Sequence, residues 1–178
     1  NLDFNWLDQD PASPRPRDGA VLSPLVPVDA NQNPAGAFLN DHRFAGMAGY
    51  DGKAAGGQWS TTASASYSSQ PTLRGFLQEL ANAPDNARGL RENISLTDVY
   101  LDSHLSWKLR HAVTLLVGAD YLHGTGTAQG ADFAYTAPLN GAQAVVVRVP
   151  AELDVHIDDH RDFFGAYTLL EWRPLERL

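Results

Sequence analysis

The chain has 178 residues, no cysteine and a formal net charge of -8 at pH 7. The acidic balance argues against a nucleic-acid-binding protein, which needs basic patches. Without cysteine there is no disulfide framework and no thiolate metal site. The longest apolar run, 112–119, falls far short of the about 20 residues that a transmembrane helix requires, so none is predicted.

Six short segments alternate apolar and polar residues, as strands with two different faces do. In 97–109, Val99 and Leu101 share one face, whereas Asp98 and Asp102 share the other. The six segments are 2–6, 43–51, 59–68, 97–109, 113–121 and 163–172. Aromatic residues lie at the two ends of each apolar face, a pattern typical of strands that cross an outer membrane.

The connections between these segments alternate long and short, as in bacterial outer-membrane barrels with short periplasmic turns and long external loops. Residues 8–41, 69–96 and 123–161 are the long connections, and 52–58 and 110–112 are the short ones. Placing the short turns in the periplasm predicts two aromatic belts, because aromatic rings favour membrane interfaces. The periplasmic belt holds Trp59, Trp107 and Trp172, and the outer belt holds Trp6, Phe44, Tyr67, Tyr121 and Phe164.

The three long connections carry their own signals. Residues 9–40 are rich in proline and predict an extended segment with little regular structure. In the second connection, Leu73, Phe76, Leu77 and Leu80 follow Thr72 at helical spacing, which predicts a short surface helix ended by Asn82 and Pro84. In the third, GTGTAQG at 124–130 predicts a flexible loop, and 145–149 a hairpin above the membrane.

The predicted fold class is therefore all-β, with about six antiparallel up-and-down transmembrane barrel strands and long external loops. Single-chain membrane barrels have at least eight strands, so six strands predict a fragment of a larger barrel or part of an assembly. The sequence begins at Asn1 without a signal peptide, and we expect a processed product or an excised piece. Residues 1–178 are expected to form one partial β-barrel domain.

Two segments resemble the TonB-dependent outer-membrane receptors. One is the hairpin Asp98 to His123, DVYLDSHLSWKLRHAVTLLVGADYLH, and the other is Asp162 to Leu178, DFFGAYTLLEWRPLERL. Together they cover about a quarter of the chain. The sequence departs from the family's full pattern, because it has no recognisable plug domain, no coupling box near its start and no terminal aromatic residue.

The resemblance implies a large barrel around a plugged lumen in the bacterial cell outer membrane. It also implies uptake of a scarce nutrient, commonly an iron-siderophore complex or another metal chelate. The implied partners are outer-membrane lipid, that small-molecule ligand and an energy-coupling protein that acts through the absent plug. No enzyme activity, cofactor or nucleic-acid partner is expected.

Candidate ligand-binding residues lie in two places. Asp102 and His104, with Glu171, are expected to face the lumen, where polar groups are also ordinary solvation. His156, Asp158 and His160, with Asp154 and Asp159, cluster before the last segment, and histidine with carboxylate can bind a divalent ion. Their spacing matches no closed metal site, so a ligand contact competes with a solvated loop, and no metal-binding or catalytic residue is assigned.

Two alternatives stay open. An outer-membrane barrel enzyme or adhesin would use a Ser, His and Asp constellation at the outer rim or bind through its loops. A soluble β-sandwich binding module would turn the same apolar faces into a core between two sheets. That sandwich would have to bury Trp6, Trp59, Trp107 and Trp172 and would be soluble without detergent.

Overall fold

The computed structural model describes residues 1–14, 17–18, 21–110, 112–142 and 154–173. These residues form an antiparallel sheet of six strands in the order β1-β4-β5-β6-β7-β8, together with a separate two-stranded sheet. The six strands are β1 (Leu2–Gln9), β4 (Phe38–Ala54), β5 (Gly57–Leu77), β6 (Ala87–Arg110), β7 (Val113–Tyr135) and β8 (Val155–Trp172). The short pair is β2 (Arg17–Asp18) and β3 (Val21–Leu22).

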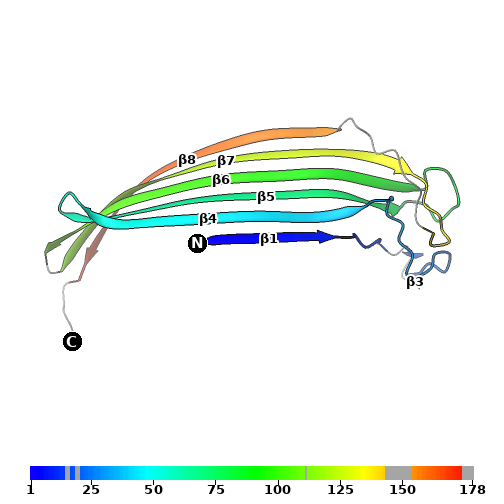
Figure 1. Cartoon of the computed structure of the whole chain (residues 1–178), viewed down its shortest axis with the longest axis horizontal. Helices are drawn as coiled ribbons and strands as arrows, with labels where there is room; N and C mark the ends of the chain where they lie inside the picture. Colours follow the sequence, from blue (N-terminus) through cyan, green and yellow to red (C-terminus); the bar gives the residue numbers. More distant parts are fainter. Residues whose placement is uncertain (15–16, 19–20, 111, 143–153, 174–178) are drawn as a thin grey trace.

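The six strands follow one another side by side, and all except the eight-residue β1 are long, so that the sheet is an elongated, curved layer (Figure 1). Among the residues that the structure describes, the sheet is open: β1 pairs only with β4 and β8 only with β7, which leaves both as edge strands. The prediction of six antiparallel strands in chain order is confirmed, whereas closure into a barrel is not seen. Within the described residues there is no helix of the length and apolar character that a membrane crossing requires.

Both short connections are hairpin turns. Ala54 pairs with Gly57, and the two turn residues Ala55 and Gly56 both have positive φ, at 48° and 74°. Positive φ at both central residues is the geometry of a type I′ turn, whose twist matches that of the flanking strands. The turn between β6 and β7 follows a register shift between Lys108 and Arg110. The first turn sets the pairing of β4 with β5, and the second sets the pairing of β6 with β7.

The surface helix predicted after Thr72 is wrong. Leu73, Phe76 and Leu77 belong to β5, where they pair with residues of β6. Alternation puts Leu73 in a buried cluster at 8% exposure and leaves Phe76 on the other side at 44%. Burial and the backbone ladder together outweigh a helical spacing that rests on four residues.

The flexible loop predicted at 124–130 is also wrong, because all seven residues lie within β7 and pair with both β6 and β8. The strands therefore extend well into the predicted external loops, and the connections shorten to 78–86 and 136–154. Glycine and polar residues carry little strand preference themselves, but two neighbouring strands supply their hydrogen bonds. The hairpin predicted at 145–149 lies outside the described residues.

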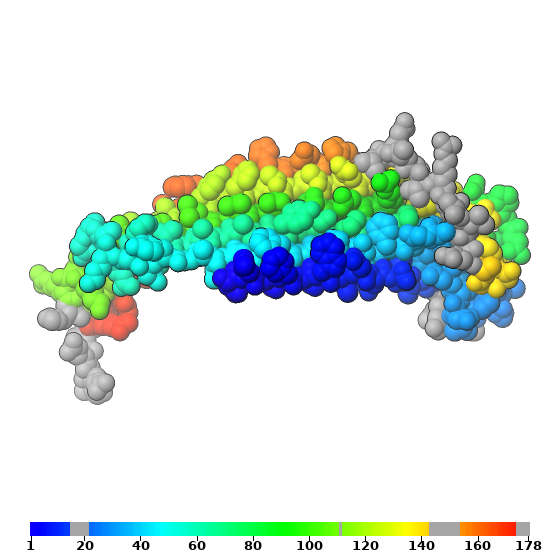
Figure 2. Space-filling view, viewed as in Figure 1, coloured from blue at the N-terminus to red at the C-terminus, as the bar shows by residue number. Residues whose placement is uncertain are grey.

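A small buried cluster lies at the end of the sheet where these connections meet. It contains Leu73, Ala87, Phe133, Tyr135 and Ala137, with Phe38 and Leu77 packed against it. Figure 2 shows the described parts of the connections gathered at this end of the elongated body. The chain thus places its buried core beyond the alternating segments rather than between two layers.

Asn86 ties this cluster together. Its side chain is 1% exposed, donates to the carbonyls of Ala81 and Ala137, and accepts a hydrogen bond from the Ala137 amide at 2.8 Å. Removing the amide would leave a buried donor and two carbonyls without their partner, at about 1–3 kcal/mol. We expect Asn86→Ala to lower the free energy of unfolding in urea by this amount.

The matched control is Asn82→Ala, since Asn82 is exposed in the same connection. An equal loss in both variants would show that the Asn86 hydrogen bonds do not hold this end together.

Burial raises the pKa of Tyr135 to about 12. Its hydroxyl group donates to the carbonyl of Gln32, and the residue is 2% exposed. In the unfolded chain a tyrosine loses its proton near pH 10, so above that pH the unfolded state binds fewer protons than the folded state. Stability is therefore expected to fall between about pH 10 and pH 12, as measured by urea unfolding at each pH.

Tyr135→Phe keeps the ring but has no proton to lose. The variant should be less stable than the parent at neutral pH and should show a shallower loss above pH 10. Parallel curves for the two proteins would contradict the assignment to Tyr135.

Candidate functional site

One face of the sheet carries all four tryptophans, and we call it the tryptophan face. The register places Trp6 opposite His42, Trp59 opposite Leu105, Trp107 opposite Leu115 and Trp172 opposite Val113, all on this side. Between them lie aliphatic residues such as Ala63, Leu101, Val117 and Leu170. Trp6 and Trp172 are 71% and 69% exposed, so nothing in the described residues buries them.

Aromatic rings border this apolar surface at two levels. The first border is marked by Phe44, Tyr67, Tyr121 and Phe164, and the second border by Tyr50, Trp59, Trp107 and Trp172. The indole N–H groups of Trp59 and Trp107 donate to Ser103 and to the carbonyl of Ala55. The rings thus keep an apolar body against the aliphatic residues while their polar atoms have partners, as rings at a polar–apolar boundary do. We call the surface between the borders the apolar band.

The apolar band runs obliquely across the strands. Residues that pair across neighbouring strands form a row perpendicular to the strands. Phe44 and Tyr67 lie in the row of Thr125, whereas Phe164 lies in the row of Tyr121, four residues earlier in β7. At the other border, Tyr50 lies in the row of Ala119, and Trp172 lies in the row of Val113, six residues earlier in β7. Both borders shift in the same direction from β4 to β8.

Polar pairs lie just outside the first border. The Trp6 ring stacks on His42 with centroids 3.5 Å apart, and both donate to Asp8, at 2.7 and 2.9 Å. The hydrogen bond from His42 lowers the pKa of Asp8 below its usual value. Beyond Tyr121, His123 contacts Asp162 at 2.8 Å. On the tryptophan face, the side chains next to the first border are therefore already polar.

The opposite side, which we call the polar face, carries a three-residue network. Tyr167 on β8 donates to Asp102 Oδ2 on β6 at 2.6 Å, and His104 Nδ1 contacts Asp102 Oδ1 at 2.9 Å. The network spans three strands, because β7 lies between β6 and β8. Hydrogen bonds to a carboxylate are shorter and stronger than neutral ones, so this network ties β6 to β8.

Glycine makes this reach across β7 feasible. Gly118 lies between His104 and Tyr167, and a Cβ atom there would overlap the Tyr167 ring. The same arrangement recurs at Gly124, which the Arg161 side chain crosses to meet Asp98 at 3.2 Å. In both cases a β8 side chain passes over a β7 glycine to a carboxylate of β6.

The candidate residues of the sequence fall on opposite faces. Asp102 and His104 lie on the polar face, whereas His156, Asp158 and His160 lie on the tryptophan face beyond the first border. The expectation that these last three sit in a loop is wrong, because they belong to β8. The sheet therefore does not bring the two sets together.

The described part of the chain contains no group of side chains arranged as a metal site or a catalytic site. No three His, Asp or Glu side chains there are grouped so as to hold a metal ion. One carboxylate–histidine pair on the polar face, Asp102 and His104, contacts the hydroxyl group of Tyr167. Such a set can hold a proton and a hydrogen-bonded ligand, but general base catalysis also needs a reacting group in reach.

Sequence reasoning missed Tyr167 and Arg161. The connection after Arg110 is short, but a register shift between Lys108 and Arg110 is needed to place Asp102 opposite Asp120. The sequence did not reveal this shift, and the β7–β8 register, which crosses a long connection, could not be read from it either. Glycines at 118 and 124, on the same side of one strand, were the available signal that larger side chains cross there.

No family model matches the chain, and neither does any curated protein or solved structure.

The Gly118 crossing can be tested by a pair of substitutions. Alanine normally suits a strand better than glycine by about 0.5–1 kcal/mol, but at Gly118 its methyl group would displace the Tyr167 ring from Asp102. We expect Gly118→Ala to lower the free energy of unfolding by about 1–3 kcal/mol, the usual cost of overpacking. The measurement is unfolding in urea followed by circular dichroism.

Gly49→Ala is the control, since Gly49 lies on the same polar face and its nearest neighbour for a Cβ is 3.7 Å away. This variant should match or exceed the parent in stability. A loss of the same size at both positions would mean that the contact of Tyr167 with Asp102 does not contribute to the free energy of unfolding.

Proposed function

We propose that this chain forms part of the wall of a bacterial outer-membrane β-barrel of the TonB-dependent receptor type, which takes up a scarce nutrient. The observation that carries the proposal is that all four tryptophans lie on one face, with Trp59, Trp107 and Trp172 at one border of an exposed apolar band and Trp6 just outside the other. Lipid-facing surfaces of such barrels have this band with aromatic girdles at both interfaces. The polar face would then line the lumen.

The oblique course of the band supports a membrane orientation. A shift of four to six residues over four strand-to-strand steps, with a rise of about 3.3 Å and a strand spacing of about 4.8 Å, corresponds to a strand tilt of about 35–45°. Transmembrane barrel strands tilt by about 35–45°. A planar hydrocarbon layer would therefore meet the tilted strands along both aromatic borders.

The height of the band agrees with this orientation. Trp59 and Tyr67 are eight residues apart on β5, which is about 27 Å along the strand and about 20 Å along a membrane normal at that tilt. The outward apolar band of outer-membrane barrels is about 25 Å tall and is flanked by aromatic girdles, which is close to this height. The described strands continue beyond Tyr67 to the buried cluster, which would stand outside the membrane.

The uptake function rests on the resemblance of residues 98–123 and 162–178 to the receptor family. The soluble sandwich accounts less well for the tryptophan face, because in the described residues no second sheet packs on it. The enzyme or adhesin alternative needs a nucleophile with a base, or a binding loop, and no geometry in the described part favours either.

Quenching of tryptophan fluorescence tests the membrane position. The chain is refolded into bilayers whose lipids carry bromine either near the headgroup or near the chain end. Tryptophans at the interface should be quenched more by the shallow bromines than by the deep ones. A water-soluble chain whose fluorescence ignores both lipids would refute the proposal.

A charge scan tests which face meets lipid. Ala63 lies midway along the band on the tryptophan face, and Ser64 beside it lies on the polar face. Arginine facing lipid near the midplane costs about 2–4 kcal/mol. We expect Ala63→Arg to lower the free energy of unfolding from bilayers by that amount, and Ser64→Arg to lower it by less than 1 kcal/mol. The reverse ranking would place the lipid on the polar face.

A further inference from the structure

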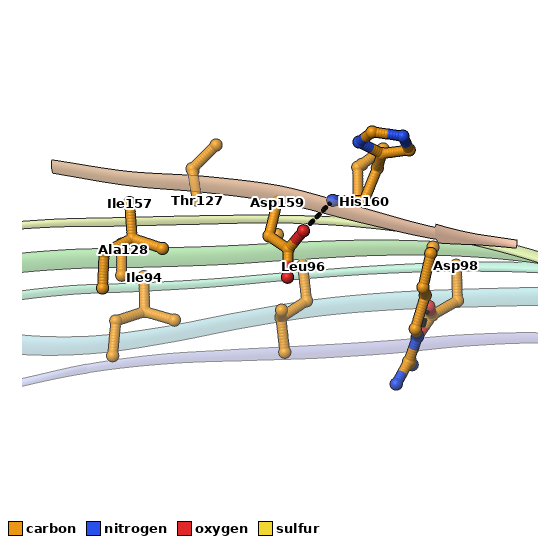
Figure 3. Close-up of a pocket in the computed structure, with 12 residues that line it drawn as sticks. Ile94, Leu96, Asp98, Thr127, Ala128, Ile157, Asp159 and His160 are labelled. Carbon is orange, nitrogen blue, oxygen red and sulfur yellow. Dashed lines mark hydrogen bonds and ion pairs between the residues drawn. The ribbon is translucent and has the colours of Figure 1, made fainter.

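A groove runs along β7 on the polar face, over the residues whose sequence suggested a loop. Its floor is Gly124, Gly126 and Ala128, and its walls include Ile94 and Leu96 of β6. Ile157 of β8 forms the facing wall (Figure 3). The volume of the groove is about 340 Å³. We call it the β7 groove. Its volume lies within the range of small-molecule sites.

The strand register explains the groove. Gly126 lies between Leu96 and Asp159, and Ala128 lies between Ile94 and Ile157. Each row thus has a small residue flanked by two larger ones, so the middle strand forms a trench between two walls. The ladder on both sides of β7 holds these walls in place.

The walls are apolar although they lie on the polar face. Leu96 is 51% exposed and Ile157 is 55% exposed. Farther along the same face, the surface carries Asp102 and His104. Aliphatic residues that gather in a groove and stay uncovered mark an interaction site more often than isolated ones do.

The charge at one end of the groove selects the ligand. Asp98 and Arg161 pair across Gly124 at 3.2 Å, and Asp159 adds a second carboxylate, whose Oδ1 accepts the His160 amide at 2.8 Å. Two carboxylates against one guanidinium leave this end with one negative charge. A cationic group is therefore attracted to the same end that the apolar walls lead to.

We propose that the β7 groove binds a small molecule with an apolar body and one cationic group. The body lies between Leu96, Ile94 and Ile157, and the cation lies beside Asp159. The inference goes beyond the proposed membrane function and does not require it, because the groove lies on the side away from the tryptophans.

The test uses three probes of similar size and different charge: 2-phenylethylammonium, 2-phenylethanol and 3-phenylpropanoate. Binding to the full chain in detergent micelles is measured by calorimetry, with protein-free micelles subtracted. The cation should bind most tightly and the anion least. Equal binding of the three probes, or tighter binding of the anion, would overturn the proposal.

Two substitutions place the binding in the groove. Ala128→Leu fills the floor and should abolish binding of the cation. Ala134→Leu makes the same change farther along β7, on the same face and at an exposed residue, and should leave binding intact. Equal effects of the two, or none from Ala128→Leu, would show that the probe binds elsewhere.

Asp159→Asn keeps the acceptor for the His160 amide and removes the charge. It should weaken cation binding roughly three- to five-fold, as expected for one partly exposed charge contact, and leave 2-phenylethanol unchanged. Unchanged cation binding would refute the role of Asp159. Lipid quenching of the tryptophans is read separately, so failure of the membrane proposal and failure of the groove are distinguished.

Discussion

The hydrogen-bonded register between neighbouring strands decides on which side of the sheet each residue of this protein lies. A shift of one residue would move every side chain of a strand to the other face. The two tight turns, at Ala55–Gly56 and after Arg110, align β4 with β5 and β6 with β7, and the long β5–β6 ladder aligns the two pairs with each other. The separation of the tryptophan face from the polar face depends on this alignment.

A single layer of this kind gains little from burial, since nothing in the described residues covers most of either face. The compact buried cluster at one end stabilises the connections rather than the middle of the sheet. An exposed apolar band with open edges at β1 and β8 would invite aggregation in water. Lipid around the band would cover its apolar surface, and neighbouring strands would pair with the edges at β1 and β8. The proposed barrel wall therefore accounts for more of the structure than a soluble domain does.

Small residues on β7 have two separate effects on the polar face. Where a long side chain of β8 crosses a glycine, as Tyr167 does at Gly118, the strands are tied together by polar contacts. Where aliphatic residues flank the small ones, as at Ala128, the same lack of side-chain volume leaves a groove. The difference lies in the residues of β6 and β8 that stand opposite, not in β7 itself.

The sequence by itself determined the strand class, the number of strands in the main sheet and the residues that share a face in the six short segments, because alternation is a local property of an extended chain. It did not determine how far the strands extend. Leu73 and Leu77 suggested a helix and GTGTAQG a loop, whereas pairing with β6 and β8 made both into strand. Contacts across the long β7–β8 connection, such as Tyr167 with Asp102 and the walls of the β7 groove, were decided only by the tertiary structure, because no local turn fixes that register.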